Sequence, residues 1–349
     1  MRQRRKPKAL FLTIIAVATA IAASLFVISY KCIWSKNVET PEGKDVSVFI
    51  ATCSDFQAVE DSLCSNCHII QPASFKFIAK RLNYVEHIRP GHYIVRDGMS
   101  NIQLINMLRF GKQTPVKVIF NNIRTVEQLA GKISSEIEAD SLSILNELRN
   151  DSSLMANGFN QYNYASIFIP NTYEFYWNTD AKGFLNRMKR EYKIFWDESR
   201  LKKAESKSLT PLEVSTLASI VDKETSKVSE MRAIAGVYLN RLKKKRLLQA
   251  DPTLVFATGD YGIHRVLNVH KEIDSPYNTY KHLGLPPGPI CIPSITAIDA
   301  VLNAEDHKYL YFCAKDDLSG YHVFAKTLDE HNANAERYRR ALNKNRIYK

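Results

Sequence analysis

Residues 9–30 form an uncharged, mainly apolar run, and five basic residues lie among residues 1–8. An apolar helix of this length can cross a bilayer core of about 30 Å. Because the basic residues lie on its N-terminal side, we expect residues 1–8 to be a cytoplasmic basic tail, residues 9–30 a transmembrane helix, and the rest of the chain to be exported. The alternative is a cleaved signal peptide, with small residues such as Ala20, Ala22 and Ala23 at the cleavage site. The run is longer than the apolar core of a typical signal peptide, so the sequence favours a membrane anchor.

The part of the chain after the anchor is large enough for two packed modules. The 349 residues have a hydrophobic content of 45%, which is typical of a folded chain and not of a disordered one. Of the formal net charge of +12, five charges lie in residues 1–8, and the remaining +7 (12 − 5 = 7) suits an anionic polymer or a membrane surface. No stretch resembles a nucleic-acid-binding module. Residues 31–45 are polar and contain Pro41 and Gly43, so we expect a linker between the anchor and the first module.

The pattern of apolar residues predicts an α+β fold for both modules. Alternation between turn signals predicts strands, and caps followed by helical periodicity predict helices. In the first module we expect strands at residues 46–51 and 91–95 and helices at residues 56–63, 72–82 and 100–108. In the second module we expect strands at residues 114–120, within 167–177, at 309–314 and at 321–324, and helices from Thr125, at 142–149, at 182–196, from Thr210, at 231–242, from Asp251, at 294–303 and from Thr327.

Glu224 lies where an ordinary solvated carboxylate is not expected. Its helix begins with Thr210 as the cap of a capping box, and Leu217, Ile220 and Val221 form an apolar stripe that Glu224 extends. Desolvation on an apolar face raises the pKa of a carboxyl group, so that it can hold a proton near neutral pH, as a general acid must. The plain structural alternative is an exposed glutamate at a frayed helix end.

Asp222 is the nearest other acidic residue in this helix. It precedes Glu224 by two positions, which places it roughly 200° away around the helix at about 100° per residue. The two acids therefore cannot act as a close pair, and the pattern nominates Glu224 alone.

Three segments follow Glu224. Residues 231–242 have the unbroken apolar face of a second helix, and the basic residues 243–246 suit the negative C-terminal end of that helix. Asp251 before Pro252 predicts a helix cap followed by a helix start. Residues 277–289 are rich in proline and glycine, so we expect a rigid loop that carries polar and aromatic side chains.

Several short segments occur here in a distinctive order and spacing: LASIVDKET, VYLNRL, LQADPT, YNTY, GLPPGPI and a terminal YLYF, GYHVF and EH. They resemble the catalytic domain of the MltG/YceG family of endolytic murein transglycosylases. The resemblance implies a small LysM-like module at residues 46–113 and a larger mixed α/β YceG-like catalytic domain at residues 114–349. The first module is the looser match, and its structural alternative is a spacer that binds no ligand.

The resemblance also implies roles for particular residues. Glu224 matches the catalytic acid of the family, while Asp222 stands where the family has a glutamate. The implied substrate-binding residues are Gln249 and Asp251, which lie in the active-site region, and Tyr277, Asn278 and Tyr280 of the loop. His322 and His331 recur in the closing motif of the family, but neither has Cys or acidic partners at metal-ligand spacing, so we expect structural histidines, no metal and no cofactor.

The activity implied by the resemblance is that of a membrane-anchored lytic transglycosylase. Such an enzyme would cut the bond between N-acetylmuramic acid and N-acetylglucosamine inside nascent peptidoglycan strands, leave 1,6-anhydro ends and terminate strand elongation. It would sit in the bacterial cytoplasmic membrane with its N-terminus in the cytoplasm, bind glycan strands outside, and work with peptidoglycan synthases. The rival from another class is a non-catalytic glycan-binding scaffold of the wall-synthesis machinery, in which Glu224 is only structural.

The segment Cys64-Ser65-Asn66-Cys67-His68 has the C-x-x-C-H pattern of covalent haem attachment. Haem needs an apolar pocket, which a small LysM-like module does not suggest, so an exported cytochrome is a motif-only hypothesis. Because Cys53 is nearby and exported proteins are oxidised, we expect one disulfide among Cys53, Cys64 and Cys67, without a defined pairing.

Overall fold

A computed structural model describes residues 7–263 and 265–345. The chain divides into two compact units, which are described separately. The first comprises the described part of Met1–Lys117 with Glu136–Glu138 and Glu174–Thr179, and the second comprises the other described residues. Most of the expected basic tail, residues 1–6, lies outside the described residues.

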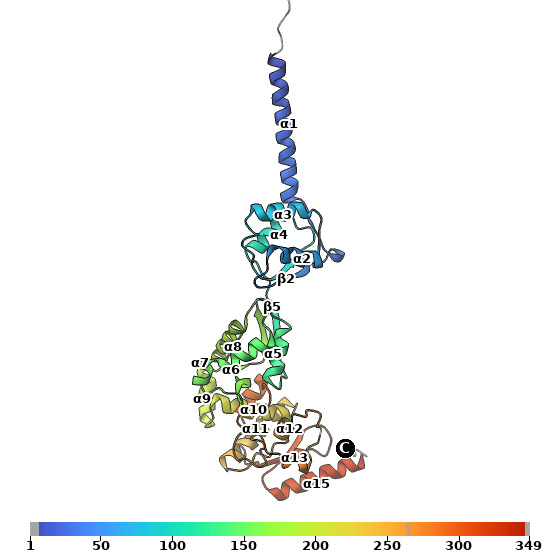
Figure 1. The fold of residues 1–349 in the computed structure, drawn as a ribbon. Helices are drawn as coiled ribbons and strands as arrows, with labels where there is room; N and C mark the ends of the chain where they lie inside the picture. Colours follow the sequence, from blue (N-terminus) through green and yellow to red (C-terminus); the bar gives the residue numbers. More distant parts are fainter. Residues whose placement is uncertain (1–6, 264, 346–349) are drawn as a thin grey trace, which may run out of the picture. The chain divides into compact units, whose positions relative to one another are not determined.

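The apolar run forms one long helix, α1, from Pro7 to Trp34 (Figure 1). Proline suits the first helical position because its missing N–H has no partner there in any case. Within Phe11–Trp34, an 18-residue window has a mean hydropathy of 2.6, and the side chains of residues 11–31 are exposed. By length and composition, α1 could cross a membrane once.

The first unit holds two small antiparallel sheets and three helices beyond α1. Strand β2, Val46–Ile50, pairs with β4, Gly91–Val95, in a register that places Val48 opposite Tyr93. Both side chains are completely buried, so this pair lies in the core of the unit. The helices are α2 (Phe56–Asn66), α3 (Pro72–Arg81) and α4 (Asn101–Arg109). These elements follow the predicted order closely, and Ser100 caps α4 as expected.

The predicted linker at residues 31–45 is instead largely structured. Helix α1 continues through Trp34, β1 (Val38–Glu39) pairs with β3 (His68–Ile69), and a short 3₁₀ turn spans Pro41–Gly43. The polar residue Asn37 is buried and donates to Asn101 Oδ1 at 2.6 Å. Because polar groups such as this one find hydrogen-bond partners inside the unit, the polar residues of 31–45 can be part of it. Their composition alone predicted an exposed linker.

The expected disulfide is absent, which corrects that prediction. Cys53, Cys64 and Cys67 are all free thiols. Cys67 ends α2 with its side chain in the core, and its Sγ donates to the carbonyl of Leu63 at 3.2 Å. Because Cys67 is buried and not directed outward beside the exposed Cys64, the C-x-x-C-H segment does not present two sulfurs to a haem.

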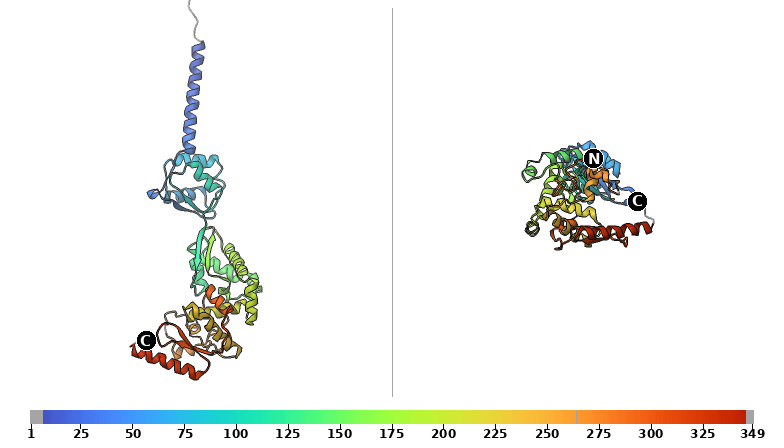
Figure 2. Two further views of the ribbon diagram at one scale, coloured as in Figure 1. Left: turned by 180° about the vertical axis from the view of Figure 1, so that it is seen from behind. Right: turned by 90° about the horizontal axis from the view of Figure 1, so that it is seen from below.

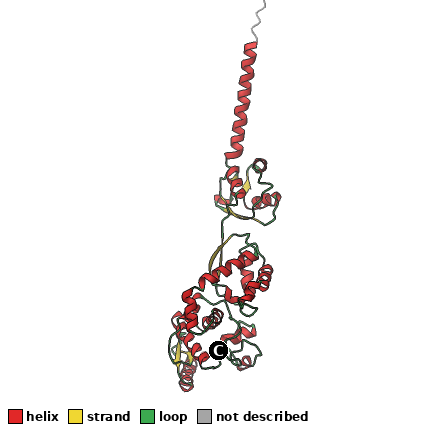
Figure 3. Ribbon diagram, turned by 90° about the vertical axis from the view of Figure 1, so that its left-hand side faces the viewer, coloured by secondary structure: helices red, strands yellow, loops and turns green. Residues whose placement is uncertain are grey.

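The second unit is mostly helical, with only short strands (Figure 3). Strands β5 (Val116–Phe120) and β6 (Asn171–Phe175) pair at its start, and β7 (Tyr311–Ala314) and β8 (His322–Ala325) form an antiparallel hairpin. Its helices are α5 (Val126–Ser134), α6 (Ser141–Asn150), α7 (Ser152–Ala156), α8 (Ala181–Phe195), α9 (Glu198–Ser206), α10 (Pro211–Glu224), α11 (Val228–Lys243), α12 (Asp251–Thr258), α13 (Asn268–Lys271), α14 (Ile295–Leu302) and α15 (Leu328–Lys344), with a 3₁₀ turn at Tyr164–Ile167. A mixed α/β fold was expected and is found.

Helix α10 is central to the core of the second unit. Thr210 and Glu213 form the predicted capping box, and residues 214–221 are all buried. Helix α10 packs against α11, α12 and α14, while α15 packs on the β7–β8 hairpin at one edge of the unit (Figure 2). Burial on all sides fixes where the C-terminal end of α10, and therefore Glu224, lies.

Helix α9 was not predicted. It covers the run rich in Lys and Ser before Thr210, and only Ala204 in it is buried. Asp197 caps the helix, and Arg200 forms an ion pair with Asp299 at 3.3 Å. A helix with one buried position leaves almost no apolar periodicity to detect.

The free thiols lead to a prediction about alkylation. In native, non-reduced protein we expect the exposed Cys53 and Cys64 to react with N-ethylmaleimide. Cys67 should react only after unfolding, because burial raises the pKa of its thiol to about 11 and removes the reactive thiolate. Mass spectrometry of the peptides measures both; a disulfide-linked peptide pair among these three cysteines would contradict the structure.

Candidate active site

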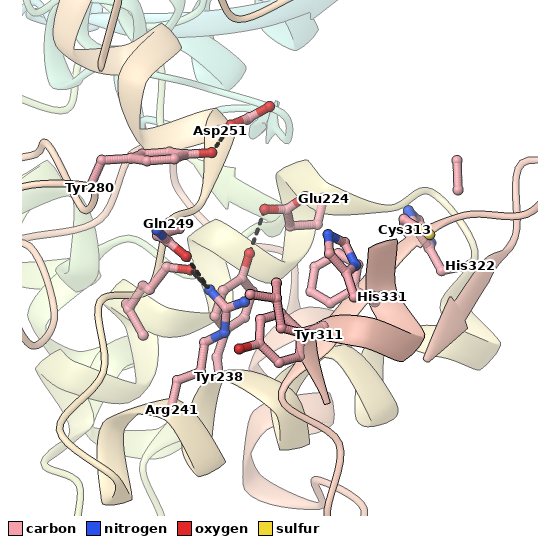
Figure 4. Close-up of a pocket in the computed structure, with 14 residues that line it drawn as sticks. Glu224, Tyr238, Arg241, Gln249, Asp251, Tyr280, Tyr311, Cys313, His322 and His331 are labelled. Atoms are coloured by element: carbon pink, nitrogen blue, oxygen red, sulfur yellow. Dashed lines mark hydrogen bonds between the residues drawn. The ribbon is translucent and has the colours of Figure 1, made fainter. Parts of the chain in front are cut away.

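A cavity of about 430 Å³ opens in the second unit at the end of α10 (Figure 4). Its walls come from the ends of α10 and α11, the start of α12 with the segment before it, the loop at Tyr280, the β7–β8 hairpin and the start of α15. The lining residues are Glu224, Tyr238, Arg241, Leu248, Gln249, Asp251, Tyr280, Tyr311, Phe312, Cys313, Ala314, His322, Leu328 and His331.

Glu224 is the last residue of α10, and its partly buried side chain lines this cavity. The apolar stripe of Leu217, Ile220 and Val221 is completely buried, so the stripe carries Glu224 inward as the sequence predicted. The hydroxyl of Tyr238 donates to Glu224 Oε1 at 2.5 Å, as Figure 4 shows.

The surroundings of Glu224 raise its pKa from 4.5 to about 7. Burial is the largest cause, because it disfavours the charged form, and the negative charge of Asp251 adds to it. The hydrogen bond from Tyr238 and the positive charge of Arg241 oppose the rise, since both favour the carboxylate. Near neutral pH the group can therefore give up a proton and take one back.

Asp222 does not line the cavity. Its Oδ1 accepts a hydrogen bond from the hydroxyl of Ser294 at 2.5 Å, and Lys223 lies 3.9 Å from its other carboxylate oxygen. Asp222 thus joins α10 to the start of α14, on a different face from Glu224, as the helical geometry predicted.

Tyr238 and Arg241 are cavity residues that the sequence reasoning missed. Tyr238 was placed in the apolar face of the second helix, where its ring is indeed buried, but its hydroxyl reaches Glu224. Arg241, one turn later on α11, donates from Nε to the carbonyl of Leu310 at 2.6 Å and from Nη1 to that of Leu248 at 2.7 Å. Tyr238 and Arg241 are three residues apart, so they lie on one face of α11. This spacing could have indicated a polar site, but a tyrosine in an apolar stripe looks like an ordinary core residue.

Asp251 is not a helix cap, which corrects the sequence-based expectation. Ala250 occupies the cap position and makes no side-chain cap, and Asp251 is the first residue of α12. The freed carboxylate lines the cavity and accepts a hydrogen bond from the hydroxyl of Tyr280 at 2.5 Å. Gln249, with a φ of 50°, also lines the cavity, and its Oε1 accepts from Arg241 Nη1 at 3.4 Å.

Tyr277 and Asn278 lie in the same loop as Tyr280 but do not line the cavity. The hydroxyl of Tyr277 donates to the carbonyl of Tyr162 at 3.1 Å. Asn278 is completely buried and donates to the carbonyls of Lys271 and Ile273. Both side chains use their polar atoms to hold the loop that presents Tyr280.

The two histidines of the closing motif lie at the cavity. His322 contacts Glu230 twice. The Nδ1 atom of His322 lies 3.0 Å from Glu230 Oε2, and the backbone N–H of His322 donates to Glu230 Oε1 at 2.7 Å. His331 stacks on Tyr311 with ring centroids 5.3 Å apart, and no hydrogen-bond partner for its buried Nδ1 lies among the described residues. Burial lowers the pKa of His331, and the charge of Arg241 lowers it further, so both favour the neutral ring.

Among the residues that the structure describes, no cluster of three His, Cys, Asp or Glu side chains could hold a metal ion. The cavity residues can transfer protons and form hydrogen bonds. Glu224 supplies a titrating acid, and Tyr238, Arg241, Gln249, Asp251 and Tyr280 supply polar atoms around it. A polar cavity of this kind suits a hydroxyl-rich substrate with a bond that needs acid catalysis.

Several known proteins are similar to this chain. The model of the YceG-like family matches residues 48–337. A relative from Bacillus subtilis named endolytic murein transglycosylase is 29% identical over 88% of this chain and 89% of its own length. A relative with the same name from Streptococcus pneumoniae is 27% identical over 88% of this chain, which spans 61% of that longer protein. The crystal structure of a YceG-like protein from Listeria monocytogenes aligns with a TM-score of 0.55 and 26% identity over 83% of this chain and 98% of that one.

The raised pKa of Glu224 predicts a pH-dependent stability. Between about pH 4.5 and 7 the folded protein holds a proton that the unfolded chain has released. This contribution to the free energy of unfolding is fully present below pH 4.5 and is lost as the pH rises to 7. Glu224→Gln does not titrate, so its Tm should rise relative to that of the wild type over this interval in thermal melts. Glu205→Gln, on the exposed face of α9, should show no such trend; a constant Tm difference for Glu224→Gln would refute the raised pKa.

Proposed function

Because the chain belongs to the YceG-like family, we propose that it is an endolytic peptidoglycan lytic transglycosylase. It cleaves the bond between N-acetylmuramic acid and N-acetylglucosamine within nascent strands and leaves a 1,6-anhydro end, which terminates strand elongation. The names of the curated relatives support the reaction class. The observation that carries the proposal is Glu224, a carboxyl group with a pKa of about 7 in a polar cavity.

Glu224 acts twice in the proposed reaction. In its protonated form it donates a proton to the bridging oxygen as the bond from that oxygen to C1 of the muramic acid breaks. As a carboxylate it then accepts the proton of the C6 hydroxyl of the same sugar, whose oxygen forms a new bond to C1. No water is consumed, and Glu224 ends in the form in which it began. Attack from within the same sugar has a high effective concentration, so a second catalytic carboxylate is not required.

The neighbours of Glu224 fit this double role. Tyr238 bonds Oε1, and within the described residues no protein donor reaches Oε2, which leaves that oxygen for the substrate. A pKa near ambient pH maximises the fraction of groups able to act as acid first and base second. Gln249, Asp251 and Tyr280 offer amide, carboxylate and hydroxyl groups to the hydroxyl and acetamido groups of the sugars.

Helix α1 supports the proposed location. We infer that it crosses the bacterial cytoplasmic membrane once, with the basic N-terminal residues in the cytoplasm and the cavity outside, near newly made glycan. Peptidoglycan synthases are the partners that supply such strands. The LysM-like role proposed for residues 46–113 is to position the strand; a spacer role is the alternative.

The rival function is a non-catalytic glycan-binding scaffold. A scaffold needs a polar groove but has no use for a carboxyl group whose pKa is raised to about 7. A second carboxylate, Asp251, lines the same cavity, and hydrolysis with Asp251 as the base is the other alternative. Hydrolysis would give a reducing end that is heavier than the anhydro end by one water, so one product analysis separates all three functions.

Glu224→Gln tests the proposal directly. The amide keeps the shape and can still accept from Tyr238, but it cannot transfer a proton. Loss of general acid catalysis costs about 10²- to 10⁴-fold, so we expect anhydro-ended muropeptides to become undetectable when purified peptidoglycan is digested and analysed by mass spectrometry.

Asp222→Asn is the matched control, because Asp222 lies in the same helix outside the cavity. It should retain most of the wild-type rate. The assignment fails if Glu224→Gln forms anhydro ends at close to the wild-type rate, or if Asp222→Asn is the variant that abolishes them.

Tyr238→Phe should move the pH dependence of the rate. In the wild type, activity should fall above about pH 7, where Glu224 loses the proton that it must donate. The hydrogen bond from Tyr238 lowers the pKa of Glu224, so removing the hydroxyl should shift this decline to higher pH. Initial rates of anhydro-end formation between pH 5 and about pH 9 measure the shift. Tyr176→Phe, which removes a hydroxyl from an exposed side chain, is the control. If the decline is not shifted in Tyr238→Phe, the hydrogen bond from Tyr238 does not lower the pKa of Glu224.

A further inference from the structure

Two arginines flank Tyr311 at one end of the cavity. The guanidinium carbon of Arg241 lies 5.2 Å from the centre of the Tyr311 ring, and that of Arg246 lies 5.7 Å from it. Arg246 also donates from Nη1 to the Tyr311 hydroxyl at 2.8 Å. Arg241 and Tyr311 line the cavity itself (Figure 4), and Arg246 reaches its edge through the contact with Tyr311.

The backbone at the end of α11 directs Arg246 to this position. Lys245 has a left-handed φ of 50°, and the N–H of Arg246 donates back to the carbonyl of Arg241 at 2.9 Å. This is the geometry of a helix C-terminal cap, here without the glycine that usually takes the left-handed position. The turn at Lys245 brings Arg246 to Tyr311. Of the basic residues 243–246, Arg246 therefore has a contact beyond the helix dipole.

Arg241 interacts electrostatically with the carboxyl group of Glu224, whose pKa its charge lowers. Within the part of the chain that the structure describes, no Asp or Glu forms an ion pair with Arg241 or Arg246. Arg241 uses Nε and Nη1 on backbone carbonyls and Gln249, and Arg246 uses Nη1 on Tyr311. A guanidinium has five N–H donors, so several remain for a ligand. Arg241 is partly buried and Arg246 is exposed, and the planar guanidinium groups of both match carboxylates well.

We propose that Arg241 and Arg246 form an anion-binding subsite beside Tyr311 that takes a carboxylate carried by the glycan strand. The identity of the strand rests on the proposed function. A peptidoglycan strand carries carboxylates on its peptide stems, or on the lactyl groups of muramic acid where the peptides have been removed, whereas a chitin oligosaccharide carries none. The subsite therefore selects acidic murein over neutral polymers of N-acetylglucosamine.

Arg246→Gln tests this subsite, because Arg246 is exposed and does not line the catalytic cavity. Binding is measured by calorimetry on the full-length protein in detergent, with Glu224→Gln present to prevent turnover. The three probes are solubilised strands with peptide stems, the same strands stripped by an amidase, and a chitin oligosaccharide. We expect Arg246→Gln to weaken binding of acidic strands about tenfold at low salt and much less at high salt, because the lost contact is electrostatic.

The matched control is Arg190→Gln, which removes an exposed arginine from α8. Its binding of all three probes should equal that of the parent protein. A loss confined to peptide-bearing strands identifies the stem carboxylates as the ligand, a loss confined to stripped strands identifies the lactyl carboxylates, and a loss on both shows that either is accepted.

The subsite is refuted if Arg246→Gln binds acidic strands as tightly as Arg190→Gln, or if it loses the chitin oligosaccharide to the same extent. The proposed function is tested separately, by anhydro-end formation in protein that retains Glu224. If that reaction is absent, the binding comparison still decides whether the arginines recognise an anion.

Discussion

The hydrogen bond from Tyr238 to Glu224 is the contact on which the rest of the site depends. Burying a carboxyl group is costly unless it is hydrogen-bonded, and the packing of α10 against α11 supplies this one donor at 2.5 Å. A single donor satisfies one oxygen and leaves the pKa of the group at about 7. With more donors the group would become an ordinary carboxylate, and with none its pKa would rise further.

The other walls of the cavity are held by their own hydrogen bonds. Thr279 fixes the segment before α12, because its hydroxyl accepts from the N–H of Ala250 at 3.0 Å and its carbonyl accepts from that of Gln249 at 3.1 Å. Arg241 ties the end of α11 to the carbonyl of Leu310, just before β7. Segments distant in sequence are thereby fixed around one acid, and preorganisation of this kind is what proton transfer in a defined geometry requires.

The sequence predicted the elements that have strong local signals. The capping box at Thr210 predicted where α10 begins, and the apolar stripe predicted that the side chain of Glu224 lies on the buried face. Both are local signals that can be read from residue spacing along one helix. The sequence could not assign Asp251, since an aspartate before a proline looks like a cap whether or not it serves as one. Tyr238 was hidden because a buried aromatic ring fits an apolar face equally well with or without a partner for its hydroxyl. Helix α9 and the structured part of residues 31–45 were missed for the opposite reason, because polar residues form them.

The central claim is that one carboxyl group, Glu224, titrates near neutral pH and serves as both acid and base. The most direct measurement is a titration of that carboxyl group by ¹³C NMR in protein with labelled glutamate, assigned by comparison with Glu224→Gln. We predict one glutamate resonance with a midpoint near pH 7 that is missing from the variant. If every glutamate carboxyl group titrates near the ordinary value of about 4.3, Glu224 is fully ionised at neutral pH and the proposed mechanism is wrong.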